Sequence, residues 1–466
     1  MGERVASWAI PAVVGVAALV SAALWLRSSP AGEFILREPG ADRTGAAAVQ
    51  EEPKELHGTI TRGMGTPAEV AGSWTRFRGA RFDNISSEDV PLARSWPEGG
   101  PKVLWSLPVG EGYAGAAILK GCVYMLDYDQ EKRADAMRCF SLADGQEIWR
   151  FSYPVRVKRN HGMSRTVPAV TEKHVVGIGP KCHVTCLIAE DGMLRWPILD
   201  LVREHGAKVP PWYAGQCPLI DGDRLILAPG GPDALLLALE CETGKVVWKT
   251  PNPDAWKMTH TSIMPMEFAG RRTYVYSASG GVVGVDASDG SIVWKTAEWK
   301  IRIANCPSPV VLDGGRIFLT GGYNAGSRMI QLKEADGAIT AETLFAYEPK
   351  VFDCEQQTPI LFDGHLYSVR SDGQLACMNL DGKVLWSSGA AVKFGLGPFL
   401  LADGLLFVMN DTGTLTLVEP SPGGYKQLAQ AKVLDGHDSW GPMAIAGGRL
   451  IVRDLTRMIC LDVRRP

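Results

Sequence analysis

Residues 281–296 read GVVGVDASDGSIVWKT, in which a short apolar segment leads into the turn Asp289-Gly290 and a second apolar segment carries Trp294. Asp-Gly is favoured in tight antiparallel turns because both central residues can adopt positive φ. The arrangement recurs with its turn glycines 42 to 52 residues apart, from Gly145 to Gly424. The other copies are Asp144-Gly145 with Trp149, Asp191-Gly192 with Trp196, Thr243-Gly244 with Trp248, Asp336-Gly337 with Ala341, Asp381-Gly382 with Trp386 and the weaker Gly423-Gly424 with Leu428.

A repeat of this length is typical of a four-stranded β-propeller blade. Each repeat also opens with an apolar strand, usually after a proline-containing turn. Eight openings stand against seven complete units, so we expect residues 102–107 to complete the last blade and close the ring. The sequence therefore predicts an all-β fold, an eight-bladed β-propeller of four-stranded antiparallel blades over residues 72–466. The openings are at Ala116, Pro168, Pro218, Ile263, Pro309, Pro359, Pro398 and Pro442.

One tryptophan position recurs in the outer part of the repeats. A tryptophan can bury a large apolar area while its ring N–H reaches a backbone acceptor. We expect these rings to pack between blades, because a cofactor could not contact six equivalent outer positions. The predicted docking residues are Trp105, Trp149, Trp196, Trp248, Trp294 and Trp386.

The composition excludes two classes of protein. The 466 residues carry a net charge of −3, and 21% of them are charged. This balance fits neither a polybasic nucleic-acid-binding protein nor a disordered acidic chain. We therefore expect no nucleic acid among the partners.

The N-terminus holds an uncharged apolar stretch, residues 6–26, between Arg4 and Arg27. About 20 apolar residues can cross a bilayer as a helix. Residues 1–27 are thus expected to be a signal anchor or transmembrane helix that tethers the protein to a membrane, with a cleaved signal peptide as the alternative. Residues 28–71, rich in Ala, Gly, Glu and Pro, are expected to be a flexible linker. Both interpretations place the propeller outside the cytoplasm, in the periplasm or at the cell surface.

The repeated Asp-Gly-x-x-x-Trp element resembles the tryptophan-docking motif of the quinoprotein-like, or PQQ-like, eight-bladed propellers. The segment Trp74-Thr-Arg-Phe-Arg-Gly79, followed by Pro101-Lys-Val-Leu-Trp105, is similar to the start of PQQ-like repeat proteins of planctomycete-type bacteria. The superfamily includes alcohol dehydrogenases that use pyrroloquinoline quinone (PQQ) and the outer-membrane assembly lipoprotein BamB. The resemblance implies a fold, which by itself does not carry a function across.

The resemblance implies two functions of different classes. A BamB-like propeller would be a protein- or ligand-binding or scaffolding module in envelope assembly, with a protein or peptide partner. A quinoprotein oxidoreductase would hold PQQ with Ca²⁺, but the adjacent cysteines that such enzymes place over the quinone are missing, as is a C-x-x-C-H haem motif. We expect a binding module without cofactor or metal, rather than an enzyme, and keep a quinoprotein oxidoreductase with a degenerate site as the alternative.

The chain has ten cysteines, an even number that in an exported protein raises the possibility of disulfides. Cys139 and Cys186 both lie six residues before the turn glycine of their repeats. Equivalent positions on different blades are too far apart to bridge, so we expect free, buried thiols. A metal site at Cys182 and Cys186 is not expected, because residues four apart on a strand are separated by about 13 Å.

The loops that enter the first strand of each blade gather around the axis of a propeller, where binding residues are expected. These loops carry histidines, aromatic residues and charged residues that would form a polar, aromatic-rimmed funnel for a small molecule or a peptide. Ordinary loop polarity is the alternative. The funnel candidates are Tyr113, His161, Arg165, Trp212, Tyr213, Gln216, His260, Asn305, Asp353, Glu355, Gln356, Lys393, His437, Asp438 and Trp440.

Overall fold

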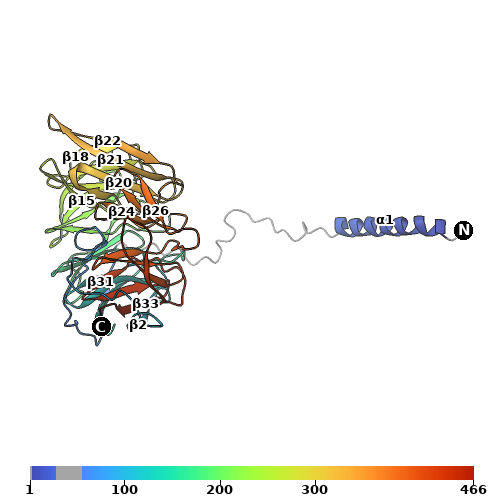
Figure 1. The fold of residues 1–466 in the computed structure, drawn as a ribbon, viewed down its shortest axis with the longest axis horizontal. Coiled ribbons are helices and arrows are strands. Elements are labelled where there is room, and N and C mark those ends of the chain that lie inside the picture. Colours follow the sequence, from blue (N-terminus) through green and yellow to red (C-terminus); the bar gives the residue numbers. More distant parts are fainter. Residues whose placement is uncertain (1–2, 28–54, 466) are drawn as a thin grey trace. The chain divides into compact units, whose positions relative to one another are not determined.

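The computed structural model describes residues 3–27 and 55–465, and the chain divides into two compact units, residues 1–54 and 55–466. The first unit contains the helix α1 (Glu3–Arg27), drawn in blue in Figure 1. Apolar side chains along α1 are exposed, among them Leu19 at 72% and Trp25 at 73%. Within the described residues, no helix has the length and hydropathy that a membrane span requires.

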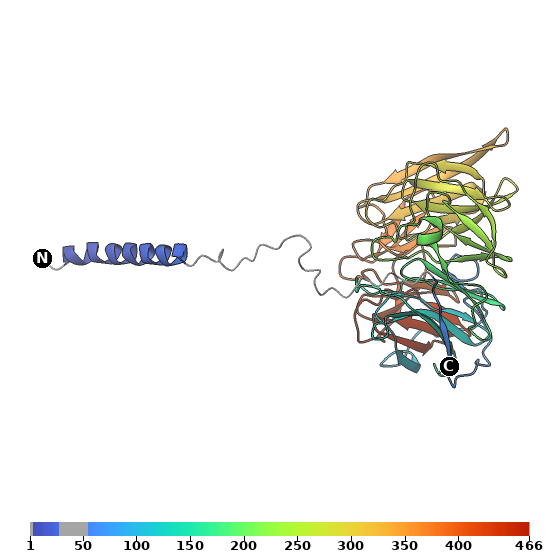
Figure 2. The ribbon, with the colours of Figure 1, turned by 180° about the vertical axis from the view of Figure 1, so that it is seen from behind.

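Residues 55–465 form eight antiparallel sheets arranged as the blades of a β-propeller (Figures 1 and 2). The prediction of an all-β, eight-bladed fold is confirmed. Strands inside the blades are buried on both faces, as in β28 (Leu405–Met409), where all five residues are buried. These strands therefore read as continuous apolar runs. All ten cysteines lie in described parts of the chain and are free, as predicted.

The strands fall into blades in chain order. Blade 1 has β3 (Ala117–Leu119), β4 (Cys122–Asp129), β5 (Ala134–Ser141) and β6 (Glu147–Pro154); blade 2 has β7 (Ala169–Val170), β8 (His174–Ile178), β9 (His183–Ile188) and β10 (Leu199–Asp200), followed by α2 (Leu201–His205). Blade 3 has β11 (Leu219–Asp221), β12 (Arg224–Leu227), β13 (Leu237–Glu240) and β14 (Val246–Lys249); blade 4 has β15 (Met264–Phe268), β16 (Arg271–Ala278), β17 (Gly281–Asp286) and β18 (Ile292–Thr296).

The remaining blades repeat the pattern. Blade 5 has β19 (Val310–Leu312), the 3₁₀ turn η3 (Asp313–Gly315), β20 (Arg316–Gly321), β21 (Gly326–Ala335) and β22 (Ala338–Tyr347); blade 6 has β23 (Ile360–Phe362), β24 (His365–Val369), β25 (Leu375–Asn379) and β26 (Val384–Ser387). Blade 7 has β27 (Phe399–Ala402), β28, β29 (Thr414–Val418) and β30 (Gln427–Lys432); blade 8 has β31 (Ala444–Ala446), β32 (Arg449–Arg453), β33 (Arg457–Asp462) and, from the N-terminal side, β2 (Lys102–Pro108).

The ring closes by pairing β2 with β33, from Lys102 opposite Asp462 to Pro108 opposite Arg457. This is the closure that the sequence predicts with residues 102–107. One apolar cluster runs through the junction, with Trp105 of β2, Ile459 of β33 and Leu126 of β4 among its buried members. Both ends of the propeller chain are therefore held in the same core.

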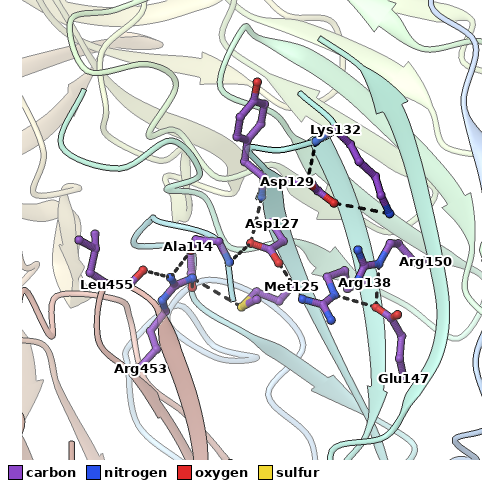
Figure 3. A network of polar contacts seen from close by, with 12 residues as sticks. Ala114, Met125, Asp127, Asp129, Lys132, Arg138, Glu147, Arg150, Arg453 and Leu455 are labelled. Carbon is purple, nitrogen blue, oxygen red and sulfur yellow. Dashed lines mark hydrogen bonds and ion pairs between the residues drawn. The ribbon is translucent and has the colours of Figure 1, made fainter. Parts of the chain in front are cut away.

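A polar network also joins the last blade to the first (Figure 3). The buried Arg453 of β32 donates hydrogen bonds to the carbonyl oxygens of Gly110, at 2.9 Å, and Leu455, at 2.8 Å. Asp127 of β4 accepts the N–H of Gly110, at 2.8 Å, and pairs with Arg138 of β5 through its second carboxylate oxygen, at 2.7 Å. The network fixes the segment between β2 and β3.

A fifth strand extends blade 1. β1 (Thr59–Arg62) pairs with β6, from Thr59 opposite Ser152 to Arg62 opposite Trp149. β1 lies within residues 28–71, the range expected to be a linker; of that range, residues 28–54 lie outside the described residues. The described remainder contributes a strand to the propeller instead of forming a free tether throughout.

Four of the docking tryptophans cover the turn glycine of the next blade. A Cβ atom on Gly145 would lie 2.9 Å from the Trp105 ring, and one on Gly192 would lie 2.6 Å from the Trp149 ring. These glycines have positive φ as well, so the turn and the ring both require glycine there. The Trp105 N–H donates to the Leu142 carbonyl at 3.1 Å. Trp196 on Gly244 and Trp248 on Gly290 repeat the arrangement.

Blades 4 to 6 depart from this arrangement. The Trp294 ring lies against Gly284 of its own blade, and Gly337 has no atom near its Cβ position. The long hairpin β21–β22, labelled at the top of Figure 1, carries Gly337 at its tip. Where Ala341 replaces the tryptophan, the rings of Phe345 and Tyr347 cover Gly382 instead. Trp386 donates its ring N–H to the Ser421 carbonyl at 2.8 Å.

Residues 72–95, here called the strap, run across one end of the propeller. Trp74 bridges Ile118 of β3, and the Arg76 side chain donates to the Ile220 carbonyl of β11 at 2.8 Å. Two residues later, the buried Arg78 donates to the Thr358 carbonyl beside blade 6 at 2.8 Å. The strap thus passes from blade 3 to blade 6 between Arg76 and Arg78, and this crossing must lie near the axis. Further contacts join Ile85 to Leu401 of blade 7 and Ala93 to Val463 of blade 8.

Candidate functional site: a pocket on the propeller axis

A pocket of about 320 Å³ is lined by residues from the loops that enter all eight blades. Only the axis brings these eight loops together, so this central pocket lies where the sequence predicted a funnel. Its volume is at the lower end of the range for small-molecule sites. Five aromatic residues are in the lining: Phe77, Tyr113, Trp212, Tyr323 and Trp440.

Phe77 is one of the residues that line the central pocket. It belongs to the strap, and the neighbouring Trp74 and Arg76 contact residues within or at the end of the innermost strands β3 and β11. The other lining loops mostly precede the innermost strands. Burial lowers the pKa of Arg78 to about 10, and its hydrogen bonds to Thr358 and Pro359 hold this part of the strap in place.

Arg165 is the one permanently cationic side chain in the described lining of the central pocket. Its guanidinium lies 4.9 Å from the centroid of the Tyr113 ring. Nε donates to the Trp212 carbonyl, and Nη2 lies 3.1 Å from the Asn160 carbonyl and 3.2 Å from that of His161. These bonds hold the guanidinium in place through Nε and Nη2, whereas Nη1 donates none of them.

Tyr113 and Trp440 form one wall of the central pocket, with ring centroids 5.2 Å apart. The Tyr113 hydroxyl donates to Asp438 at 3.2 Å, and the Trp440 ring N–H donates to Asp411 at 2.7 Å. Burial, followed by the charge of Asp438, raises the pKa of Tyr113. Tyr113 is therefore a neutral donor at physiological pH, and both rings are held by carboxylates.

The mouth of the central pocket contains backbone conformations that side-chain-bearing residues adopt infrequently. φ is 52° at His161, 62° at Trp212, 74° at Tyr213 and 56° at Asp438. Positive φ is uncommon outside glycine and clusters at functional sites. The bond from Arg165 to the Trp212 carbonyl and the bond from the Tyr213 hydroxyl to the Lys158 carbonyl hold two of these residues.

Burial also sets the charge of other groups in the lining. It lowers the pKa of His260 to about 4, helped by the nearby Arg165, so this imidazole is neutral at physiological pH. Burial raises the pKa of Cys306 to about 12, which keeps it a thiol, with Arg165 and Glu355 acting on it in opposite directions. Burial and the neighbouring Asp353 raise the pKa of Glu355.

Sequence comparison assigns the propeller to a family. The sequence profile of the family described as outer membrane protein assembly factor BamB matches residues 132–381, more than half of the 466 residues. The chain belongs to the BamB family. The matched range runs from β5 of blade 1 to the turn after β25 of blade 6. The BamB-family assignment thus covers most of the blades that shape the central pocket.

Two curated relatives carry the same description. A Yersinia pestis protein described as outer membrane protein assembly factor BamB is 22% identical over 285 residues, covering 58% of this chain and 64% of that protein. One from Alteromonas naphthalenivorans is 23% identical over 319 residues, covering 62% and 70%. This BamB-family chain therefore spans just under two thirds of the length of the Yersinia pestis protein.

Solved structures share the fold. BamB from Moraxella catarrhalis has a TM-score of 0.52 at 13% identity, with 78% of this chain and 99% of that chain covered. The computationally designed protein Ika8 has a TM-score of 0.51 at 11% identity, with 77% and 99% covered. At these identities the likeness concerns the fold alone.

The structure brings eight of the fifteen predicted funnel residues of this BamB-family chain into the central pocket. They come from six of the eight blade-entry loops and include the charged, imidazole and indole groups described above. They are Tyr113, His161, Arg165, Trp212, His260, Glu355, Gln356 and Trp440.

The other seven predicted residues are not in the lining. Gln216 is fully buried and exchanges hydrogen bonds with the backbone of Ala228, and Asn305 donates to the Ser277 carbonyl. Asp353 accepts the Ser371 N–H at 3.1 Å. These three organise loops. The remaining four lie around the mouth or beside it: Tyr213, Lys393, His437 and Asp438.

Several lining residues were not predicted from the sequence. Three of them lie one or two residues from predicted candidates in the same loops: Cys217, Ser262 and Cys306. Treating every residue of these loops as a candidate would have included them. Tyr323 comes from the β20–β21 connection, and Phe77 comes from the strap, which lies outside the repeat. The other unpredicted members are Gly215, Ala304, Gln357, Leu396 and Pro442.

The lining does not fit PQQ with Ca²⁺. Ca²⁺ takes six to eight oxygen ligands, carboxylates prominent among them, and Glu355 is the one carboxylate in the described lining. Among the residues that the structure describes, no three His, Cys, Asp or Glu side chains gather as a metal site would require. A tricarboxylate such as PQQ would meet one guanidinium, that of Arg165.

Proposed function

We propose that this chain is an extracytoplasmic propeller that binds protein partners during the assembly of the outer membrane. The observation that carries the proposal is the family match over residues 132–381, whose description is that of an outer membrane protein assembly factor. The relatives from Yersinia pestis and Alteromonas naphthalenivorans carry the same description. The propeller supplies a rigid ring that displays loops, which is how a scaffold presents binding residues.

The mouth of the central pocket is the surface that we propose for partner binding. His437 is 73% exposed, and Trp212 and Tyr213 are partly exposed on a loop held in left-handed conformations. Aromatic residues that lose little conformational freedom on binding are favoured at interfaces. A mouth with fixed backbone therefore suits the docking of a protein segment.

The N-terminal helix is proposed as the membrane tether, and residues 28–71 as the connection between it and the propeller proper. Support comes from the 25-residue length of α1 and from its exposed apolar side chains, such as Leu19 and Trp25. Fractionation of cells that express the chain with and without residues 3–27 tests this tether, because only the longer form should sediment with membranes.

Chemical crosslinking in native membranes, followed by affinity capture of the tagged chain, tests the proposed function. Outer-membrane proteins and proteins of their assembly should be enriched over a capture from cells that express the untagged chain. Capture in which cytoplasmic proteins alone are enriched would overturn the proposal. A ligand that binds the folded state raises the melting temperature. The melting temperature of the purified chain should therefore stay unchanged when PQQ and Ca²⁺ are added.

A further inference from the structure

The central pocket faces two opposite charges that have no ionic partner in the described part of the chain. Arg165 makes hydrogen bonds to neutral carbonyl groups and no ion pair with a described carboxylate. Glu355 likewise forms no ion pair with a described basic side chain. Most other charged side chains that are removed from solvent here are paired or bonded, as Arg138 is with Asp127 and Glu147. Both side chains are partly buried, and a charge that is partly withdrawn from water gains from an ionic partner, which a ligand could supply.

The two charges lie on different sides of the central pocket. Arg165 precedes β7 of blade 2, and Glu355 precedes β23 of blade 6, half a ring away. Cys306 and Tyr323 of blade 5 also line the pocket, near enough to both charges for each to act electrostatically on them. The pocket therefore has a positive group on one side and a negative group on another.

Aromatic rings line the pocket together with the two charges. Tyr113 and Trp440 contact each other, and Trp212 and Phe77 are further lining residues. With a volume of about 320 Å³, the pocket is of a size that suits a small molecule.

We propose that the central pocket binds a small zwitterion of the amino-acid or dipeptide class that carries an aromatic side chain. The ligand carboxylate pairs with the Arg165 guanidinium, and its ammonium group pairs with the Glu355 carboxylate. The aromatic side chain packs against Tyr113, Trp440 and Phe77. This site shares Trp212 with the proposed partner surface at its mouth, but its occupancy by a small probe can be measured whether or not partner capture succeeds.

The charge requirement can be tested with four probes that share one side chain. L-tryptophan carries both charges, its amide carries the cation alone, N-acetyltryptophan carries the anion alone, and N-acetyltryptophanamide carries neither. Titration calorimetry on the full chain should rank L-tryptophan tightest, with each lost charge weakening binding on the order of tenfold. Equal binding of L-tryptophan and N-acetyltryptophanamide would overturn the proposal, and so would no binding of L-tryptophan or of an aromatic dipeptide.

Protein variants assign each charge to its residue. Glu355→Gln removes the charge but keeps the shape of the side chain, and Glu355 forms no ion pair with a described residue that the change could break. The variant should bind L-tryptophan no more tightly than N-acetyltryptophan. Arg165→Met should abolish the preference for L-tryptophan over its amide. Because Arg165 also holds loop carbonyls, its melting curve is recorded first, and Glu355→Gln decides the matter if Arg165→Met fails to fold. Unchanged preferences in Glu355→Gln would overturn the assignment.

A control and a comparison of sources complete the experiment. Lys245 is exposed in the turn between β13 and β14 and does not line the central pocket, so Lys245→Met should leave all four affinities unchanged. Tighter binding of an aromatic dipeptide than of L-tryptophan would identify peptide breakdown products as the ligand source. The reverse order would identify free amino acids. Both orders support the zwitterion site.

Discussion

Nη2 of Arg453, at the end of β32, lies 2.9 Å from the carbonyl oxygen of Gly110, to which it donates a hydrogen bond across 343 positions of the chain. The same guanidinium donates to the Leu455 and Asp454 carbonyls. Burial lowers the pKa of Arg453 to about 10, which still leaves it charged at physiological pH. One side chain thereby fastens the last blade to the segment that leads into the first.

Arg453→Met should lower the free energy of unfolding by about 2–4 kcal/mol, because buried carbonyl groups lose a charged donor. Urea denaturation monitored by tryptophan fluorescence measures this loss. The matched control is Arg457→Met: Arg457 has an exposed side-chain bond to Ser106, and its loss should cost about 0.5 kcal/mol or less. Equal effects of the two substitutions would contradict the role of Arg453 at the junction.

Deletion of residues 100–108 should abolish cooperative unfolding, because blade 8 then loses β2 and the ring has an open edge. Deletion of residues 59–62 is the control, since β1 only adds to a blade that already has four strands. That variant should still melt in one transition, at a somewhat lower temperature. A cooperative melt at the wild-type temperature after deletion of residues 100–108 would show that the closure is dispensable.

Asp135 should make stability depend on pH. It is 2% exposed, its Oδ2 accepts the Tyr153 hydroxyl at 2.7 Å, and burial raises its pKa from 3.8 to about 7. Below pH 4 the carboxyl group is protonated in the folded and unfolded chains alike. Between pH 4 and pH 7 the unfolded chain ionises first, so the contribution of Asp135 to folding falls as pH rises.

The measurement compares the wild type with Asp135→Asn, which keeps an acceptor for Tyr153. Relative to this variant, the wild type should lose up to about 4 kcal/mol between pH 4 and pH 8, since about three pKa units at about 1.4 kcal/mol each are involved. Urea titrations at five pH values within that range give the difference directly. A stability difference that stays constant across the range would refute the raised pKa.

Simultaneous substitution of Trp212, Tyr213 and His437 by alanine should reduce partner capture from membranes at least severalfold without loss of folding. These side chains are partly or fully exposed around the mouth, so their removal leaves the blades intact. A control variant carries Met64→Ala and Met193→Ala, two exposed residues outside the central pocket, and should capture partners normally. Undiminished capture by the mouth variant would move the partner surface elsewhere, for instance to a blade edge.

Much of the fold follows from the sequence because one local pattern repeats. The Asp-Gly turns and the tryptophans that follow them report a periodic structure, and the count of blade openings gives both eight blades and the closing strand. β1 was not predicted, because Thr59–Arg62 lacks the apolar alternation that marks a strand. It pairs along the edge of a blade that already has four strands. The position of the Trp294 ring was not predicted either. Gly337, the glycine that it would cover, lies at the tip of the long hairpin β21–β22, and the ring packs against Gly284 instead.

The candidate site was predicted in part for a similar reason. Loop position alone brings Arg165, Glu355 and Trp440 to the axis, because the loops of a propeller must gather there. Loop position does not say which side chains turn toward the axis. Gln216 and Asp353, for example, accept backbone hydrogen bonds and do not line the pocket. Phe77 lay beyond prediction, since its place depends on the strap crossing from one side of the ring to the other.

The outer-membrane protein content of cells that lack this chain tests the central claim most directly. Membranes from the deletion strain, from a strain complemented with the wild type and from one complemented with the mouth variant are compared by quantitative mass spectrometry. A role in outer-membrane assembly predicts lower amounts of outer-membrane proteins in the deletion strain, full recovery with the wild type and weaker recovery with the mouth variant. Unchanged outer-membrane protein amounts in the deletion strain would contradict that role.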